Sequence, residues 1–223
     1  NFFKINNFGI ISKSRNYGIQ KSKGFYIAFL DSDDYWENNK LMFCINNLIK
    51  KKESCICHAE NWIYPNNFVR KAIYKPHSKF THKDLLVNGN CISLSAVILE
   101  KSVLDLVGLF NEDHKINTAE DYDLWLRIAN KKINFIFIEE VLGNFLVHNE
   151  SESSNILRNS KAVQEVISLN CNNNILKIKS ISRNWISTGK NFHLKNSKIN
   201  ALTAYFQALK YEKVNFKIYF YIL

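Results

Sequence analysis

The chain has 223 residues, of which 46% are hydrophobic and 13% aromatic. That content is enough to bury the core of one α/β domain with a short appendage, and it excludes an intrinsically disordered protein. The 30 Lys and Arg against 20 Asp and Glu give a formal net charge of +10, which favours anionic partners. The basic residues are scattered and no nucleic-acid-binding motif is present. We therefore expect solvated basic faces first, a peripheral contact with an anionic membrane second, and no nucleic-acid partner.

The five cysteines predict reduced thiols, because their number is odd and their spacing fits no disulfide framework. Cys44 and Cys91 lie in apolar stretches, as buried thiols do. Cys55, Cys57 and His58 are close in sequence, but alternation along a strand places His58 on the opposite face, so a zinc site is not expected. Reduced thiols favour a cytoplasmic location.

No apolar run approaches the roughly 20 residues that span a bilayer, and no signal peptide is present. The only methionine is Met42, so residue 1 does not resemble a translation start. We expect the chain to be a fragment that lacks an N-terminal portion.

The first half of the chain predicts a helix, a strand and a second helix. Residues 12–23 form a helix that Gly18 interrupts, and residues 25–30 (FYIAFL) form a strand buried on both faces. Four polar residues, 31–34, end this strand. Residues 36–52 have helical periodicity, and Asp33 or Asp34 is the expected N-cap.

The middle of the chain continues this alternation with shorter elements. Residues 54–64 predict one or two strands, 82–87 a brief helix, 92–99 a strand, and 100–107 a helix that Gly108 ends. Residues 118–121 resemble a capping box that places Asp121 at the third position of the next helix, with Trp125 in its core. Strands follow at 135–138 and 141–147, with a bulge at Gly143.

Helical periodicity then continues from about residue 155 to 211, with Gly189 as a break. Strands and helices that alternate predict an α/β fold with a mostly parallel sheet flanked by helices. We divide the chain into a partial α/β domain, residues 1–152, and a C-terminal helical region, residues 153–223.

The acidic cluster Asp31-Ser32-Asp33-Asp34 is the strongest candidate site. Ligands of open α/β sheets bind beyond the carboxyl ends of strands, where this cluster lies. Crowded carboxylates repel one another unless a cation compensates, and Mg²⁺ and Mn²⁺ prefer oxygen ligands and bridge to phosphates. The alternative is a solvated turn followed by a helix cap.

Four motifs in order resemble one family. The segments SRNYGIQKSKGFYIAFLDSDDYWENNKL, SAVILEKSVLDLVGLFNED, AEDYDLWLRIANK and His148-Asn149-Glu150-Ser151 are similar to the inverting glycosyltransferase family 2, over residues 8 to 152. The resemblance implies a GT-A, Rossmann-like fold. The family's first strands, which hold the donor base and ribose, are not found before Asn1, so we expect this chain alone to be poorly active.

The resemblance also implies roles on the donor side of the reaction. Asp31 and Asp33 correspond to the family's Asp-x-Asp pair, which makes Asp33 the better candidate for a Mn²⁺ or Mg²⁺ ligand and Asp31 for the ribose or sugar hydroxyls. Arg15 corresponds to an arginine that approaches the nucleotide or diphosphate. His148 is a candidate third metal contact. Alternatively, Arg15 forms a surface salt bridge and His148 is an ordinary neighbour of a strand.

Asp121 corresponds to the family's general base, and Glu120 precedes it at the substrate. A helix N-terminus lowers the pKa of a carboxyl, whereas Glu120 and burial raise it, and the sequence leaves that balance open. Asp121 as a simple capping residue is the alternative. The region Asn88 to Ser95 is expected to face the acceptor.

These residues together imply transfer of a sugar, with inversion, from a nucleoside-diphosphate sugar to an acceptor hydroxyl. A UDP-sugar is the expected donor and a glycan or lipid-linked sugar the acceptor, in bacterial surface polysaccharide or lipopolysaccharide synthesis. The expected location is the cytoplasm, with peripheral contact at the inner face of the membrane. The alternative function is a relic that binds nucleotide or sugar without turnover.

Overall fold

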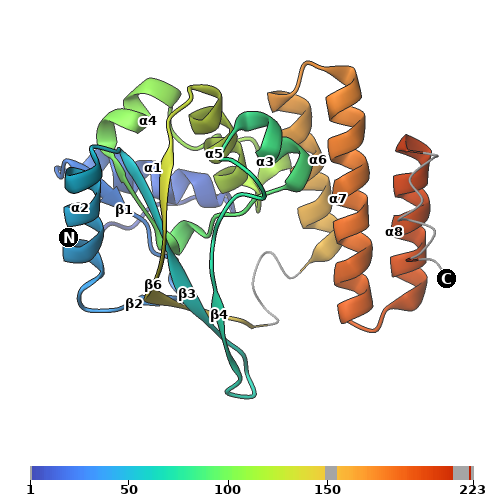
Figure 1. Ribbon diagram of the computed structural model, residues 1–223, viewed down its shortest axis with the longest axis horizontal. Helices are drawn as coiled ribbons and strands as arrows, with labels where there is room; N and C mark the ends of the chain where they lie inside the picture. Colours follow the sequence, from blue (N-terminus) through green and yellow to red (C-terminus); the bar gives the residue numbers. More distant parts are fainter. Residues whose placement is uncertain (1, 149–154, 213–220, 222–223) are drawn as a thin grey trace.

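The computed structural model describes residues 2–148, 155–212 and 221, and shows an α/β body followed by a row of helices (Figure 1). The motif residues 149–151 lie outside this part of the chain. The described strands are β1 (Tyr26–Ala28), β2 (Tyr35–Trp36), β3 (Cys55–Ile63), β4 (Val69–Ala72), β5 (Val97–Glu100) and β6 (Phe135–Leu146). The α-helices are α1 (Ile11–Lys21), α2 (Lys40–Lys51), α3 (His82–Asn88), α4 (Lys101–Val107), α5 (Glu120–Asn130), α6 (Ile156–Asn170), α7 (Asn174–Leu194) and α8 (Lys198–Tyr211), with short 3-10 turns η1 (Leu94–Ala96) and η2 (His114–Ile116).

The strands form one mixed sheet in the order β1-β5-β3-β6-β2, with β4 paired to β3. Among the described strands only β3 and β6 pair in parallel, so the α/β prediction is confirmed but the mostly parallel sheet is wrong. Hydrophobic alternation carries no information on strand direction: the β3–β4 hairpin reverses the chain, and β5 returns antiparallel to β3.

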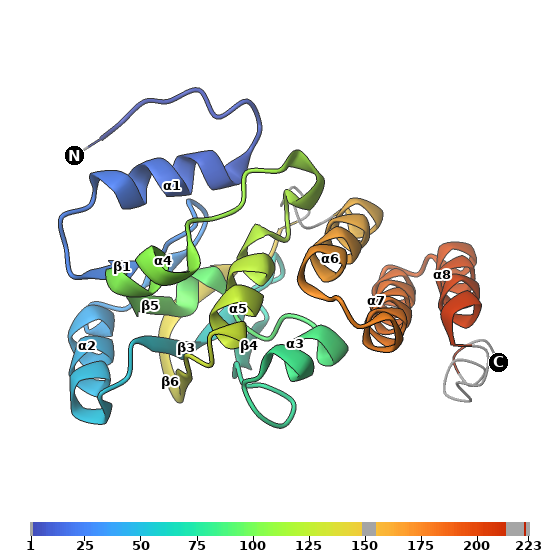
Figure 2. The ribbon, with the colours of Figure 1, turned by 90° about the horizontal axis from the view of Figure 1, so that it is seen from above.

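The sheet buries apolar side chains on both faces, as alternation along strands requires. Cys55, Cys57 and Leu99 join the larger core with Trp125 of α5. Ile56, Ile98 and Ile136 join Cys44 and Leu48 of α2 in a second core. Figures 1 and 2 accordingly show α2 and α5 on opposite sides of the central strands.

Several local expectations differ from the structure at the start of the chain. Helix α1 runs through Gly18 without a break, and β1 is short and paired on one side only within the described sheet. Trp36 belongs to β2, and the N-cap of α2 is Asn39. Asp34 therefore caps no helix; its Oδ1 accepts a hydrogen bond from the backbone N–H of Leu146.

The strand predictions near the end of the body merge into one element. β6 covers both predicted strands, and the shifts in its register against β3 lie between Phe137 and Gly143, which confirms a bulge next to Gly143. A bulge is what allows a strand of this length to bend across its partner.

The helices after the body pack in sequence order. Ala162 and Val166 of α6 share the core of Trp125, and α7 and α8 form a cluster around Tyr205. Gly189 does not break α7; a Cβ there would lie 2.3 Å from the Tyr205 ring, so glycine permits the close approach of α8. The division at residue 152 stays a prediction. None of the helices in the described part of the chain is long and apolar enough to cross a bilayer.

Candidate functional site

A cavity of about 730 Å³ lies at the ends of β1, β3 and β6 and the start of α5. Its walls contain every side chain that the sequence analysis selected: Arg15, Asp31, Asp33, Glu120, Asp121 and His148. The segment Asn90 to Leu94 also lines it, within the region expected to face an acceptor. Residues from five separate stretches of sequence thus meet at one place.

Arg15 is held between two carboxylates. Its guanidinium donates to Asp31 Oδ1 at 2.7 Å and to Glu120 Oε1, and its side chain is only 16% exposed. Burial alone would lower the pKa of Arg15, but Asp31 and Glu120 outweigh this effect and raise it. Arg15 is therefore a fixed cation on the cavity wall. It forms ion pairs with two carboxylates, of which Glu120 is the buried one.

Glu120 acts through Arg15 in this arrangement. Its second carboxylate oxygen accepts from the backbone N–H of Thr118 at 2.7 Å, and the side chain is 4% exposed. Both oxygens are engaged. Glu120 thus holds the Arg15 guanidinium in place, and the substrate-binding role that we expected for it stays a prediction.

Ser95 fixes the loop that carries Asp31. Its hydroxyl accepts a hydrogen bond from the Asp31 backbone N–H at 3.0 Å. Its carbonyl accepts from Trp36 Nε1 at 3.1 Å and from Lys40 Nζ at 2.5 Å. Lys40 is completely buried, and burial lowers its pKa to about 7. The loop is thereby tied to η1 and, through it, to α2, a function of Ser95 and Lys40 that sequence reasoning missed.

Asp33 and His148 form a pair across the cavity mouth. His148 Nε2 lies 2.6 Å from Asp33 Oδ2, and both side chains are more than a third exposed. Asp34 explains the proximity, because its hydrogen bond to Leu146 fastens the end of β6 to the Asp31–Asp34 loop. Burial raises the pKa of Asp34, as expected of a carboxyl enclosed by the fold.

The Asp33–His148 pair fits a hard divalent cation. A carboxylate and an imidazole are both accepted by Mn²⁺, whose other ligands would be diphosphate oxygens and water. The described residues contain no group of three His, Cys, Asp or Glu placed to hold a metal by themselves. Asp31 is the less available ligand, since Arg15 already occupies one of its oxygens.

Asp121 lies in the first turn of α5, facing Asn90. Asn90 donates from Nδ2 to Asp121 Oδ2 at 3.0 Å, and the Tyr122 N–H donates to Oδ1 at 2.7 Å. The predicted capping box is wrong: the N-cap is Ala119, which has no side-chain cap, and Thr118 has φ of 90°. Asp121 is therefore the second residue of the helix, not the third.

The electrostatic balance at Asp121, which the sequence left open, favours the protonated form. Burial first, and the charge of Glu120 second, raise the pKa of Asp121 to about 7, against a smaller opposite effect of Arg15. A carboxyl with this pKa can take up a proton near neutral pH, as a general base must.

Aromatic residues form another part of the cavity wall. Trp62 of β3 and Phe145 of β6 are cross-strand partners with ring centroids 5.3 Å apart. Trp62 Nε1 donates to Tyr74, whose hydroxyl donates to Glu60 Oε2 at 2.7 Å, so the indole is fixed in place. Sequence reasoning missed this wall, although alternation along the predicted strands could have placed Trp62 and Phe145 on one face.

Comparison with known proteins identifies the family of this chain. The glycosyltransferase like family 2 matches residues 6–148. The UDP-Glc:alpha-D-GlcNAc-diphosphoundecaprenol beta-1,3-glucosyltransferase WfaP of Escherichia coli is 30% identical over 157 residues, covering 69% of this chain and 59% of the relative. WfgD, of the same described activity and organism, is 32% identical over 155 residues, covering 69% and 58%.

More distant similarities extend the comparison. The putative teichuronic acid biosynthesis glycosyltransferase TuaG of Bacillus subtilis is 28% identical over 145 residues, covering 64% of this chain and 54% of the relative. The crystal structure of S. aureus TarS 1-349 in complex with UDP-GlcNAc has a TM-score of 0.55 at 14% identity, over 92% of this chain and 62% of that one. This last similarity shows a shared GT-A fold. The chain spans somewhat more than half the length of the curated relatives, and it belongs to the glycosyltransferase like family 2.

Proposed function

We propose that the protein transfers a sugar, with inversion, from a nucleoside-diphosphate sugar to an acceptor hydroxyl with the help of a divalent cation. One observation carries the proposal: a carboxyl with a pKa near 7, a fixed arginine and an Asp–His pair converge in one cavity. The relatives' names include UDP-glucose as a donor, so a UDP-sugar is the first choice.

The donor's diphosphate occupies the Asp33–His148 side of the cavity in this proposal. Asp33 and His148 would hold the cation, Mn²⁺ or Mg²⁺, and the cation would supply Lewis-acid stabilisation of the departing diphosphate charge. Arg15 adds a planar donor for the phosphate oxygens. Asp31, with one oxygen not used by Arg15, accepts from a hydroxyl of the ribose or of the transferred sugar.

Asp121 activates the acceptor. Its carboxylate takes the proton of the acceptor hydroxyl as that oxygen bonds to the anomeric carbon, while the bond from this carbon to the diphosphate breaks. Attack on the face opposite the leaving group inverts the configuration. Asn90 orients the Asp121 carboxylate, and the Trp62–Phe145 wall offers a flat apolar surface to the acceptor ring.

The names of the relatives support the choice of acceptor class. Two of them are named for acceptors with a sugar on diphosphoundecaprenol, and a third for teichuronic acid synthesis. We therefore propose a lipid-linked sugar as the acceptor, in bacterial surface polysaccharide synthesis. Such an acceptor would bring a cytoplasmic enzyme to the inner face of the membrane.

The proposal is tested by nucleotide release. The purified protein is incubated with Mn²⁺, a panel of UDP-sugars and a short-chain lipid-linked acceptor, and UDP is quantified. Turnover that Asp121→Asn and Asp33→Ala abolish, and that Asp105→Asn on the exposed side of α4 leaves intact, supports the proposal. UDP binding with no turnover under any condition would instead indicate the non-catalytic relic.

A further inference from the structure

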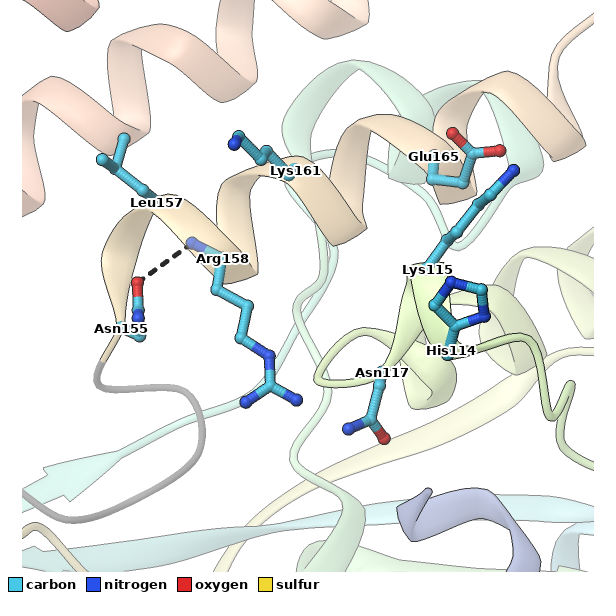
Figure 3. Close-up of a pocket in the computed structure, with 8 residues that line it drawn as sticks. All are labelled: His114, Lys115, Asn117, Asn155, Leu157, Arg158, Lys161 and Glu165. Atoms are coloured by element: carbon cyan, nitrogen blue, oxygen red, sulfur yellow. Dashed lines mark hydrogen bonds between the residues drawn. The ribbon is translucent and has the colours of Figure 1, made fainter. Parts of the chain in front are cut away.

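A second cavity, of about 620 Å³, lies between η2 and α6 (Figure 3). Both elements contribute basic side chains: His114 and Lys115 from η2, Arg158 and Lys161 from α6. Figure 3 shows Arg158 extending from α6 toward Asn117. We refer to this cavity, lined by these residues together with Asn117 and Glu165, as the basic groove.

The basic groove has an excess of positive charge. Lys115 and Lys161 face a single carboxylate, Glu165, among the residues that line it. No ion pair within 4 Å is formed by Lys115 or Lys161 in the described parts of the chain. The groove also lies beside the first turn of α6, a 15-residue helix whose N-terminal end has a partial positive charge. An anion in the groove would be attracted from two sides.

The basic groove and the candidate-site cavity share a wall. Asn117 lines the groove and Thr118 lines the cavity, so consecutive residues, about 3.8 Å apart at their α-carbons, separate the two. Asn159 of α6 fastens this wall by donating to the Thr118 carbonyl at 3.0 Å. Asp121 follows three residues after Thr118. The groove thus lies next to the place where the acceptor hydroxyl reacts.

We propose that the basic groove binds the diphosphate of the acceptor, the group that joins the acceptor sugar to its lipid carrier. This inference rests on the proposed function. The candidate-site cavity contains four acidic side chains, Asp31, Asp33, Glu120 and Asp121, and in the proposed function Arg15 and the cation that Asp33 and His148 would hold serve the donor's diphosphate. A second diphosphate would be repelled there, so an acceptor that carries one needs separate cationic partners one sugar ring away. The groove provides them.

The test uses inorganic diphosphate as a probe, in the presence of a metal chelator that disables the donor site. Isothermal titration compares the protein with the pair Lys115→Ala/Lys161→Ala and with the control pair Lys50→Ala/Lys51→Ala, which removes two exposed lysines of α2. We expect Lys115→Ala/Lys161→Ala, the groove pair, to weaken diphosphate binding at least tenfold, and the control pair to leave it unchanged. Amide NMR shifts should map the probe to residues 115–117 and the first turn of α6.

A second measurement distinguishes the source of the phosphate. A short-chain alkyl-diphosphate sugar and the matching alkyl glycoside are titrated in the same way, and only the first should lose affinity in the groove pair. Equal affinity of the groove pair and the wild type for diphosphate would overturn the inference. The inference would also be overturned if the groove pair lost its binding to anionic phospholipid vesicles but kept its affinity for diphosphate. In that case the groove would be a membrane contact.

The failure of this inference can be told from the failure of the proposed function. Binding of UDP with Mn²⁺ should be the same in the wild type and both lysine pairs. If UDP binds with Mn²⁺ but the groove does not bind diphosphate, only the assignment of the groove is wrong. If diphosphate binds in the groove but no nucleotide sugar binds with Mn²⁺, the acceptor assignment fails together with the proposed function.

Discussion

His148 Nε2 lies 2.6 Å from Asp33 Oδ2, although 115 residues separate the two in sequence. The contact exists because Asp34 binds the backbone of Leu146 and so joins the end of β6 to the loop after β1. A carboxylate and an imidazole held this way, both more than a third exposed in the cavity wall, would be two preorganised ligands for the cation proposed above.

Removal of either partner should weaken metal-dependent nucleotide binding. We expect His148→Ala to weaken Mn²⁺-dependent UDP binding about tenfold, by loss of one ligand, and Asp33→Ala to abolish it. A thermal-shift titration of UDP with and without Mn²⁺ measures both, because a ligand that binds the folded state raises its stability. His77→Ala, which removes an exposed histidine outside the cavity, is the control. UDP binding that is equally strong with a chelator in every variant would contradict the metal assignment.

The Arg15 ion pairs should contribute strongly to stability. In Arg15→Gln, the Glu120 carboxylate, 4% exposed, keeps its charge but loses its cationic partner. A buried charge without its partner costs about 3 kcal/mol in the free energy of unfolding. Urea denaturation measures the loss, and Arg183→Gln on an exposed side of α7 should change little.

The double variant separates charge from packing at the same site. Adding Glu120→Gln to Arg15→Gln removes the stranded charge, so part of the lost stability should return. If the two substitutions are simply additive, Arg15 stabilises the fold by contacts other than its ion pair with Glu120.

Because folding raises the pKa of Asp121, replacing it with a neutral residue should stabilise the fold by an amount that grows with pH. Its pKa rises from 3.8 to about 7 on folding, so the folded state retains a proton that the unfolded state releases. This stabilisation is complete below about pH 4 and is lost as pH rises through 7. Asp121→Asn cannot ionise, and should become relatively more stable by about 1–2 kcal/mol between pH 5 and pH 8, after allowance for solvent screening.

Calorimetry in the presence of a chelator gives the melting temperature of both proteins across this range. Asp105→Asn, on the exposed side of α4, serves as the control and should show no such trend. A stability difference that stays constant from pH 5 to pH 8 would show that Asp121 does not titrate near neutrality. In the active enzyme, the same group should make kcat rise with pH through about 7.

The sequence predicted which side chains line one cavity better than it predicted the sheet. The cavity residues follow from local motifs, and each such motif survives in the structure: Arg15 in α1, the aspartates after β1, Asp121 at the start of α5. Trp125 is buried in the core, as expected. Strand direction and sheet edges depend on contacts between segments that are distant in sequence. Hydrophobic periodicity gives no information about either.

The hydrogen bonds that hold the site residues in place also could not be predicted from the sequence. Ser95 holds the Asp31 loop through its hydroxyl and Lys40 through its carbonyl, but nothing in a single serine between Leu94 and Ala96 distinguishes it. Lys40 looks like an exposed first residue of a helix and is in fact completely buried. Only the tertiary fold brings these groups together.

Ser95→Ala should therefore affect the donor site without removing a group that touches substrate. The Asp31 backbone N–H would lose its acceptor, which costs about 1–2 kcal/mol when no water replaces it. We expect a several-fold rise in KM for the donor with a small change in the KM for the acceptor, since Asp121 and Asn90 are not part of this network. Ser102→Ala, on exposed α4, is the matched serine control. An equal change in both KM values would point to general unfolding of the cavity.

Two glycines in helix interiors should respond in opposite directions to alanine. At Gly189 in α7 a Cβ would lie 2.3 Å from the Tyr205 ring, so Gly189→Ala must push α8 away and should cost about 1–3 kcal/mol of stability. At Gly18 in α1 a Cβ would meet nothing within 4 Å, so Gly18→Ala should stabilise the chain by about 0.5–1 kcal/mol through helix propensity. The helix break that we expected at Gly18 is accordingly absent from α1. Urea denaturation of the two variants measures both signs, and Tyr205→Leu should restore part of the stability lost in Gly189→Ala by making room for the methyl group. A gain in stability at position 189 would mean that α7 and α8 are not packed around this glycine.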